Sequence, residues 1–290
     1  MKIGAWILAA RPKTLPAAIA PVLVGTALAA HDGVLSVTPA LICLAFALLI
    51  QVGTNFANDY FDFVQGADTQ ERIGPTRAVA AGLITPATMK RATIMVLGLA
   101  FIVGLSLVYW GGWWLVLVGV LSIICAVAYT GGPYPLGYNG LGDVFVFIFF
   151  GLVAVGFTYY VQAGVFSNIA WLLGAGVGAL SVNLLVVNNY RDLETDRVAG
   201  KRTLVVRLGR AAAWRQYVGS VVLALGIPVG LALRGYGWTM LLPLGMVPLG
   251  IFLCILLRRA KSRDDFQLVL AQTAKLLLFY SGLLAVGLVL

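Results

Sequence analysis

Long apolar runs alternate with short polar breaks along the whole chain, and the runs have the length of membrane-spanning helices. A bilayer core requires roughly 20 apolar residues per helix. On that measure the pattern predicts an all-α polytopic membrane protein with about nine transmembrane helices, forming one domain over residues 1–290. The predicted spans lie near residues 14–31, 38–62, 88–109, 112–130, 141–163, 168–189, 213–233, 238–257 and 268–290.

Two of these runs end in a cluster of one amide and two carboxylates at helical spacing. The clusters are Asn55, Asp59 and Asp62 in the first run, and Asn188, Asp192 and Asp196 in the second. Spacings of i, i+4 and i+7 or i+8 place each cluster on one face of its helix. Ionisable side chains inside a membrane segment are costly and normally face a cavity or a partner. The pattern therefore predicts two facing walls of a central cavity.

A simpler interpretation is that carboxylates at a helix end pair with basic loop residues. The repetition of the amide spacing in two runs favours a shared site over that alternative. Arg191 and Glu194 fall off the acidic face, and we expect them to form a local solvated pair.

Composition and charge restrict the function further. Hydrophobic residues make up 61% of the chain and charged residues 11%, an excess of apolar residues that a soluble globular protein does not need. The net charge of +9 raises the possibility of a nucleic-acid partner, but 18 of the 20 Lys and Arg residues fall in loops on one side of the predicted spans. This asymmetry is typical of cytoplasmic loops. It predicts no nucleic-acid partner, and a protein of a bacterial-type inner or plasma membrane with a cytoplasmic N-terminus, an external C-terminus and a cavity that opens to the cytoplasm.

Cysteine and histidine offer no alternative site. Cys43, Cys125 and Cys254 lie singly in apolar runs, and His31, the only histidine, lies in a short polar break. This spacing disfavours a disulfide framework, a zinc site and a histidine-based catalytic triad.

Carboxylates beside basic residues are the donor set of a magnesium–diphosphate site. Mg²⁺ prefers oxygen ligands and usually binds through one or two carboxylates and substrate phosphates. The basic candidates around the clusters are Arg11, Lys13, Arg72, Arg77, Lys201 and Arg202. A diphosphate at a membrane surface, above an apolar cavity, predicts a polyprenyl diphosphate. Ionisation of its allylic carbon–oxygen bond requires stabilisation of the departing diphosphate, and tyrosines such as Tyr129 can face the allylic cation.

At these residues the chain resembles the UbiA-type intramembrane prenyltransferases. The motifs are Arg-Pro-Lys-Thr-Leu-Pro at 11–16, Asn-Asp-Tyr-Phe-Asp at 58–62, Tyr-Thr-Gly-Gly-Pro-Tyr-Pro at 129–135 and Asn-Asn-Tyr-Arg-Asp at 188–192. The resemblance implies Mg²⁺, a polyprenyl diphosphate donor and an aromatic acceptor. It is greatest to the branch that prenylates 1,4-dihydroxy-2-naphthoate with loss of CO₂ in menaquinone biosynthesis.

The resemblance also implies roles for individual residues. The four acids Asp59, Asp62, Asp192 and Asp196 are expected to be catalytic and to bind the metal. The expected substrate-binding residues are Arg11, Lys13, Asn55, Asn58, Arg72, Arg77, Tyr129, Asn188, Lys201 and Arg202. The family pattern has a third acid where this chain has Gly66, and Asp68 is its nearest substitute as a metal ligand.

Two alternatives stay open from the sequence. A related enzyme would use the same chemistry on 4-hydroxybenzoate or homogentisate. An ion-coupled membrane transporter would also place carboxylates inside a helical bundle. The position of the acids at one end of their helices, among basic residues, favours the enzyme.

Overall fold

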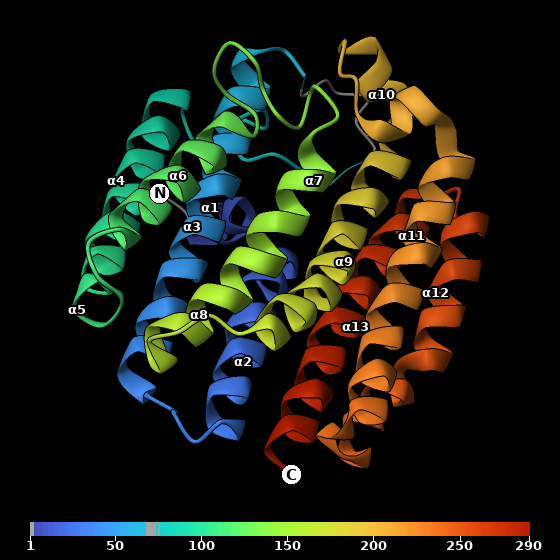
Figure 1. Cartoon of the computed structure of the whole chain (residues 1–290). Coiled ribbons are helices and arrows are strands. Elements are labelled where there is room, and N and C mark those ends of the chain that lie inside the picture. The colour runs from blue at the N-terminus through green and yellow to red at the C-terminus, as the bar shows by residue number, and fades with distance from the viewer. Residues whose placement is uncertain (1–2, 68–73, 75) are drawn as a thin grey trace.

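The computed structural model describes residues 3–67, 74 and 76–290, and these residues fold into helices joined by short loops (Figure 1). Several of the longer spans are made of two or three consecutive helical segments. The helices are α1 (Ile3–Ala10), η1 (Pro12–Thr14), α2 (Pro16–His31), α3 (Val37–Val64), α4 (Pro86–Leu105), α5 (Val108–Gly111), α6 (Leu115–Ala128), α7 (Gly142–Phe147), η2 (Ile148–Val153), α8 (Ala154–Ala163), α9 (Asn168–Arg191), α10 (Leu193–Val198), α11 (Leu204–Leu231), η3 (Ala232–Tyr236), η4 (Trp238–Met246), α12 (Val247–Arg259) and α13 (Arg263–Val289).

The predicted polytopic all-α architecture is confirmed, but the count of nine spans is not. Within the described residues, 7 helices are long and apolar enough to cross a membrane. An eighth span results if the segments Ile3–Thr14 and Pro16–His31, which meet at a bend of 50°, count as one. Helix α6 has only 14 residues, because a tight turn precedes it and the glycine-rich loop after Tyr129 follows it.

The helices close into a ring because the first and last long helices pack together. Helix α13 lies against α2, α3 lies against α4, and α9 packs against both α11 and the segment α7–η2–α8. Helices α3 and α9 run toward the same end of the molecule, where the loops after both helices gather (Figure 1). The C-terminus lies at the opposite end (Figure 1). The ends of the two helices that carry the acidic clusters therefore lie at the same end of the molecule.

Glycines allow the closest of these helix contacts. A Cβ atom on Gly151 would lie 2.5 Å from the carbonyl oxygen of Gly174, and one on Gly178 would lie 2.8 Å from that of Phe147. Small residues of this kind let the backbones of membrane helices approach closely. The contact fixes α9 against η2, a π-helical turn that contributes Phe149, Phe150 and Val153 to the cavity described below.

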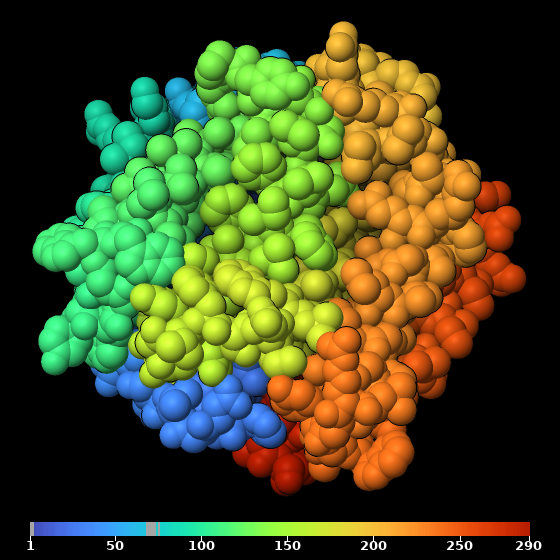
Figure 2. All heavy atoms as spheres, viewed as in Figure 1, coloured from blue at the N-terminus to red at the C-terminus, as the bar shows by residue number. Residues whose placement is uncertain are grey.

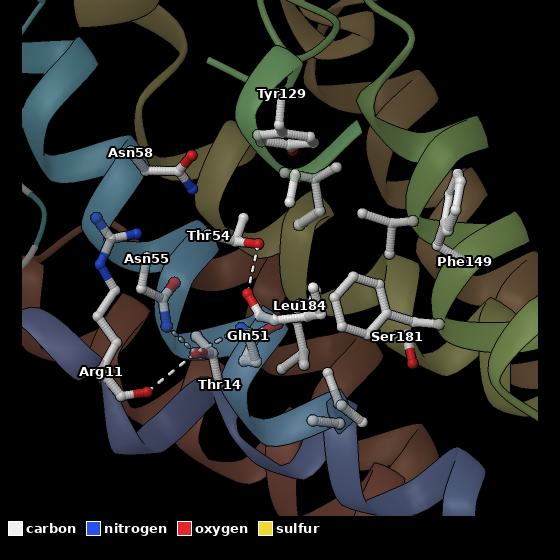
Figure 3. Close-up of a pocket in the computed structure, with 18 of the residues that line it drawn as sticks. Arg11, Thr14, Gln51, Thr54, Asn55, Asn58, Tyr129, Phe149, Ser181 and Leu184 are labelled. Carbon is white, nitrogen blue, oxygen red and sulfur yellow. Dashed lines mark hydrogen bonds between the residues drawn. The ribbon is translucent and has the colours of Figure 1, made fainter. Parts of the chain in front are cut away.

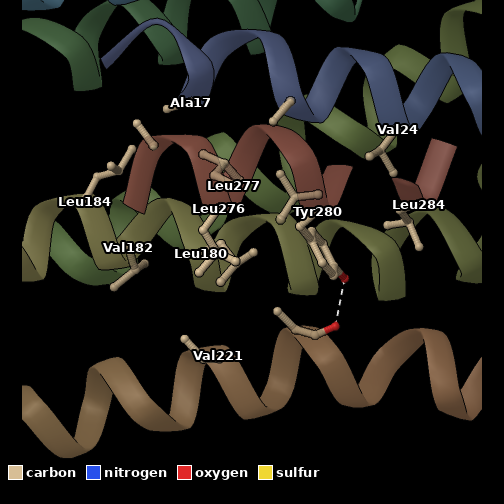
Figure 4. Close-up of a cluster of buried hydrophobic side chains, with 14 of the residues drawn as sticks. Ala17, Val24, Leu180, Val182, Leu184, Val221, Leu276, Leu277, Tyr280 and Leu284 are labelled. Atoms are coloured by element: carbon tan, nitrogen blue, oxygen red, sulfur yellow. Dashed lines mark hydrogen bonds between the residues drawn. The ribbon is translucent and has the colours of Figure 1, made fainter. Parts of the chain in front are cut away.

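The apolar core lies among α2, α9, α11 and α13 (Figure 4). Leu180, Leu276 and Leu277 are almost completely buried there, and Val221 contributes from α11. The Tyr280 hydroxyl donates to the Ala224 carbonyl at 2.8 Å, so this buried hydroxyl has a partner (Figure 4). Helix α11 packs against α9, and α12 packs against α13.

One prediction about the second acidic cluster is wrong. Residues 188–196 do not form one continuous helix, since α9 ends at Arg191 and α10 begins at Leu193, with Asp192 between them at φ −89° and ψ 9°. The chain turns here because Leu193 enters the core, whereas Glu194 is exposed. The helical hydrogen bonds still continue across the turn, from the Asp192 amide to the Asn188 carbonyl and from the Asp196 amide to the Asp192 carbonyl.

Candidate active site

A cavity of about 800 Å³ runs through the ring of helices. Its lining comes from α1 to α4, from α6 to α10 and from α13, with further residues from the connecting loops. Amide and basic side chains occupy one wall and one end, whereas apolar side chains such as Phe149 and Leu184 occupy the opposite wall (Figure 3). The cavity therefore combines a charged mouth with an apolar interior.

The first acidic cluster lies on one face of α3, as predicted, and Asn55, Asp59 and Asp62 all line the cavity. Asp59 accepts hydrogen bonds from the backbone amides of Ala78 at 3.0 Å and Val79 at 3.2 Å. These amides belong to a turn that follows Arg77 and packs onto α3. The backbone of that turn therefore holds Asp59 in place.

Asp62 is surrounded by donors from three other segments. It accepts from Arg77 at 2.6 Å, from the Tyr138 hydroxyl at 2.6 Å and from Lys201 Nζ at 3.2 Å. Because Asp62 and Arg77 are both buried, this ion pair is screened little by water. The arrangement places the Asp62 carboxylate among three hydrogen-bond donors at the charged mouth of the cavity.

The carboxylates of the second acidic cluster also lie beside basic side chains. Arg191 donates from Nε and Nη2 to the two carboxylate oxygens of Asp192, at 2.7 and 2.6 Å. Asp196 lies 3.7 Å from Lys201 Nζ. The predicted solvated pair of Arg191 and Glu194 is wrong. Arg191 is 3% exposed and lines the cavity, whereas the exposed Glu194 pairs with Arg197 at 3.2 Å.

Lys201 joins the two acidic walls. Its ammonium contacts both Asp62 and Asp196, and it lies 4.3 Å from the centre of the Tyr138 ring. The backbone holds this position, because the Lys201 amide donates to the Asp196 carbonyl and the Arg202 amide donates to the Tyr138 carbonyl. In Figure 2 the green segment that contains Tyr138 adjoins the amber segment after α10 at this end of the molecule. The predicted convergence of the two clusters on one cavity is thus observed.

Most of the other residues predicted from the sequence also line the cavity. They are Arg11, Lys13, Asn58, Arg77, Tyr129, Asn188 and Lys201. Asn58 accepts a hydrogen bond from the Thr130 hydroxyl at 2.8 Å, and Asn188 donates to the Leu184 carbonyl at 3.0 Å. Lys13 is exposed at the rim, next to the half-buried Arg11.

Three residues from the prediction are not placed at the cavity. The Arg202 side chain is exposed and does not line it, because the Arg202 backbone is held against Tyr138 while the side chain turns outward. Arg72 and Asp68 lie outside the described residues.

Several contacts of the cavity lining have no signal, or a misleading one, in the sequence. Arg191 was assigned to the solvated face, and nothing in the chain pattern marked Tyr138 as a partner of Asp62. Gln51 had a usable signal, since it precedes Asn55 by four residues and so extends the same face of α3. The π-helical turn that brings Phe149 and Phe150 to the cavity has no signature in the sequence pattern.

The acids fit a magnesium site in pairs. Within the described part of the chain, no group of three or more Asp, Glu, His or Cys residues is close enough to hold a metal ion. Mg²⁺ needs only one or two carboxylates when a substrate phosphate supplies further oxygens. Asp59 with Asp62, and Asp192 with Asp196, meet that requirement, and Arg77, Arg191 and Lys201 beside them are suited to phosphate oxygens.

Known proteins resemble this chain in sequence, and others resemble it in fold. The model of the UbiA prenyltransferase family matches residues 18–288. The 1,4-dihydroxy-2-naphthoate octaprenyltransferase of Mycobacterium tuberculosis is 43% identical over 219 residues, which cover 76% of this chain and 75% of that protein. The enzyme of the same name from Escherichia coli K12 is 42% identical over 251 residues, which cover 82% of this chain and 80% of that protein. The solved structure of a UbiA homolog from Archaeoglobus fulgidus bound to GPP and Mg²⁺ matches with a TM-score of 0.63 at 13% identity, over 97% of this chain and 100% of that one. This likeness shows a shared fold.

Proposed function

The chain belongs to the UbiA prenyltransferase family, and we propose that it transfers a polyprenyl group from polyprenyl diphosphate to 1,4-dihydroxy-2-naphthoate. The products would be demethylmenaquinol, diphosphate and CO₂. The main structural support for this chemistry is that Lys201 contacts both Asp62 and Asp196 at the mouth of a cavity with an apolar interior. The choice of acceptor rests on the two relatives named for that substrate, which are 43% and 42% identical.

In this proposal the basic side chains at the mouth bind the donor diphosphate. Arg77, Arg191 and Lys201 already lie against carboxylates, within reach of any anion that enters between the walls. Asp59, Asp62, Asp192 and Asp196 would hold Mg²⁺. When bound, Mg²⁺ supplies positive charge that stabilises the departing diphosphate.

The interior of the cavity would receive the apolar tail and the reacting carbon. Phe145, Phe149, Phe150 and Phe157 line it from the segment α7–η2–α8. Aromatic faces stabilise a neighbouring cation, and an enclosed apolar wall limits capture of that cation by water. Tyr129 also lines the cavity (Figure 3), and in this proposal its ring would face the allylic carbon.

We propose that this integral membrane protein acts as one domain, with the mouth and the N-terminus on the cytoplasmic side and the C-terminus outside. Two observations support the orientation. The mouth and the C-terminus lie at opposite ends of the molecule (Figure 1), and the loops around the mouth carry most of the Lys and Arg residues. A transporter is less well supported, because the acids lie near the ends of their helices rather than midway along them.

The experiment is a reconstituted assay with the purified full chain. With Mg²⁺ and a polyprenyl diphosphate, 1,4-dihydroxy-2-naphthoate should give demethylmenaquinol and an equal amount of CO₂, whereas 4-hydroxybenzoate and homogentisate should give little product. Turnover of 4-hydroxybenzoate without turnover of the naphthoate would refute the proposed acceptor and leave the family assignment intact. Loss of turnover when Mg²⁺ is chelated, and its return when Mg²⁺ is restored, would support the metal.

A further inference from the structure

Gln51 lies on the acidic face of α3 but deeper in the cavity than the acids. It precedes Asn55 by four residues and Asp59 by eight, so these three residues follow one face of the helix. At 1.5 Å per residue, Gln51 lies roughly 12 Å further along the helix than Asp59. It lines the cavity and is 7% exposed.

A hydrogen-bond network fixes the orientation of the Gln51 amide. The Thr14 hydroxyl donates to the Arg11 carbonyl at 2.9 Å, so its oxygen is left as an acceptor. It accepts from Gln51 Nε2 at 2.9 Å and from Asn55 Nδ2 at 3.0 Å (Figure 3). A reversed Gln51 amide would place two acceptors against each other. The nitrogen of Gln51 therefore faces Thr14, and its oxygen faces away from Thr14.

The oxygen of Gln51 lacks a hydrogen-bond partner. Oε1 is buried, and within the described residues it accepts from no donor. Buried carbonyl oxygens are nearly always hydrogen-bonded, and one without a partner requires an explanation such as a ligand. Leu184 of α9 lines the same cavity, so part of the cavity wall is apolar (Figure 3).

The substrates of the proposed reaction differ in what they can donate to such an oxygen. A polyprenyl tail has no polar hydrogen, and its diphosphate carries acceptor oxygens and belongs among the basic residues at the mouth. The aromatic acceptor carries ring hydroxyl groups, which are donors. A flat ring beside Leu184 would bring a hydroxyl to Gln51 while its other edge faces the carboxylates.

We propose that Gln51 binds the aromatic acceptor by accepting a hydrogen bond from one of its ring hydroxyls. This inference rests on the proposed function for the identity of the acceptor. It assigns to the Thr14–Gln51 pair the task of fixing the depth and rotation of the ring, so that one ring carbon faces the allylic carbon of the donor.

The test measures acceptor binding, with no donor present, by calorimetric titration of the purified full chain. The ligands are 1,4-dihydroxy-2-naphthoate, 1-hydroxy-2-naphthoate and 4-hydroxy-2-naphthoate. The wild type should bind one of the two monohydroxy compounds about tenfold more weakly than the parent, since one hydrogen bond to a buried group is lost. If all three bind equally to the wild type, the proposal is wrong, and this outcome needs no variant.

The variant Gln51→Met keeps the length of the side chain and removes its carbonyl. It should bind the parent about tenfold more weakly and no longer distinguish it from the discriminated analogue. Thr54→Val is the matched control, because the Thr54 hydroxyl lines the same cavity but donates to the Ile50 carbonyl of its own helix at 2.7 Å. Unchanged discrimination in Gln51→Met would overturn the proposal.

Failure of the proposed function would look different. If the wild type turned over 4-hydroxybenzoate and not the naphthoate, the acceptor would be reassigned. The role of Gln51 would then be tested with 4-hydroxybenzoate against benzoate, which lacks the hydroxyl. The same loss of discrimination in Gln51→Met would support it, and unchanged discrimination would overturn it.

Discussion

Lys201 Nζ lies 3.2 Å from a carboxylate oxygen of Asp62, although 139 positions separate the two residues in the chain. The same ammonium is 3.7 Å from Asp196, so one cation closes the gap between two acidic walls. Its position is set by the loop after α10, whose backbone is bound to the carbonyl of Tyr138. A diphosphate that enters the cavity would contact this ammonium between the two acidic clusters. Lys201 would then donate hydrogen bonds both to the carboxylates and to the phosphate oxygens.

Removal of the Lys201 charge should therefore weaken donor binding more than acceptor binding. For Lys201→Met we expect the KM for polyprenyl diphosphate to rise roughly 10- to 100-fold, the range for loss of a charge-assisted hydrogen bond. The KM for the acceptor should stay within about twofold of its wild-type value. Arg197→Gln is the control, because Arg197 is exposed and pairs with Glu194. Equal increases in both KM values would point to a general loss of cavity structure.

Arg202 separates the sequence-based assignment from the structural placement. The family resemblance implies a substrate-binding role for it, yet its side chain is exposed and does not line the cavity. We expect Arg202→Gln to keep its kcat and both KM values within about threefold of wild type, because the contact with Tyr138 comes from its backbone. Steady-state kinetics of this variant would contradict the placement if the KM for the donor rose as in Lys201→Met.

The first acidic cluster was predictable because it lies on one uninterrupted helix, where spacing alone decides which side chains share a face. The second was only partly predictable. Leu193 enters the core and breaks the helix there, and Arg191 turns inward to Asp192, two outcomes that depend on neighbouring helices. Lys201 was recognisable as a basic residue near acids, but its bridging position depends on the contact between the loops at 138 and 202.

The membrane orientation can be tested by cysteine accessibility. In a background without Cys43, Cys125 and Cys254, single cysteines would be introduced in the 197–210 segment and in the 163–168 loop. A membrane-impermeant thiol reagent applied to intact cells should label the second group and not the first, since basic loops stay in the cytoplasm. Labelling of the 197–210 segment from outside would contradict a mouth that receives cytoplasmic diphosphates.

The close contact between α9 and η2 predicts a stability effect. Gly151→Ala would place a methyl group 2.5 Å from the Gly174 carbonyl oxygen and 2.7 Å from the Gly178 Cα, and relaxation is restricted because both are backbone atoms of α9. We expect destabilisation of about 1–3 kcal/mol, as for other overpacked interiors, seen as a lower unfolding midpoint in detergent. Gly226→Ala is the matched control, because no atom lies within 4 Å of its added Cβ. If both variants unfolded at the same temperature, the glycine contact would not be close in the folded protein.

The four acids at the mouth give the most direct test of the proposed metal site. Each Asp→Asn change at positions 59, 62, 192 and 196 keeps the shape of the side chain and removes a negative charge. If these carboxylates hold Mg²⁺ against a departing diphosphate, each change should lower kcat on the order of 10²–10³-fold. Variants that lose only metal affinity should recover partly at raised Mg²⁺, because occupancy follows mass action.

Glu194 is the matched control for these changes, because it lies between two of the acids but is exposed and paired with Arg197. Glu194→Gln should keep nearly wild-type turnover, whereas Asp192→Asn and Asp196→Asn should lose it. The helix break at Asp192 does not alter this expectation, since Asp192 and Asp196 both line the cavity. If Glu194→Gln abolished turnover while the two Asp variants retained it, the acids of the second cluster would serve only to pair helix and loop, and the metal would have to bind elsewhere.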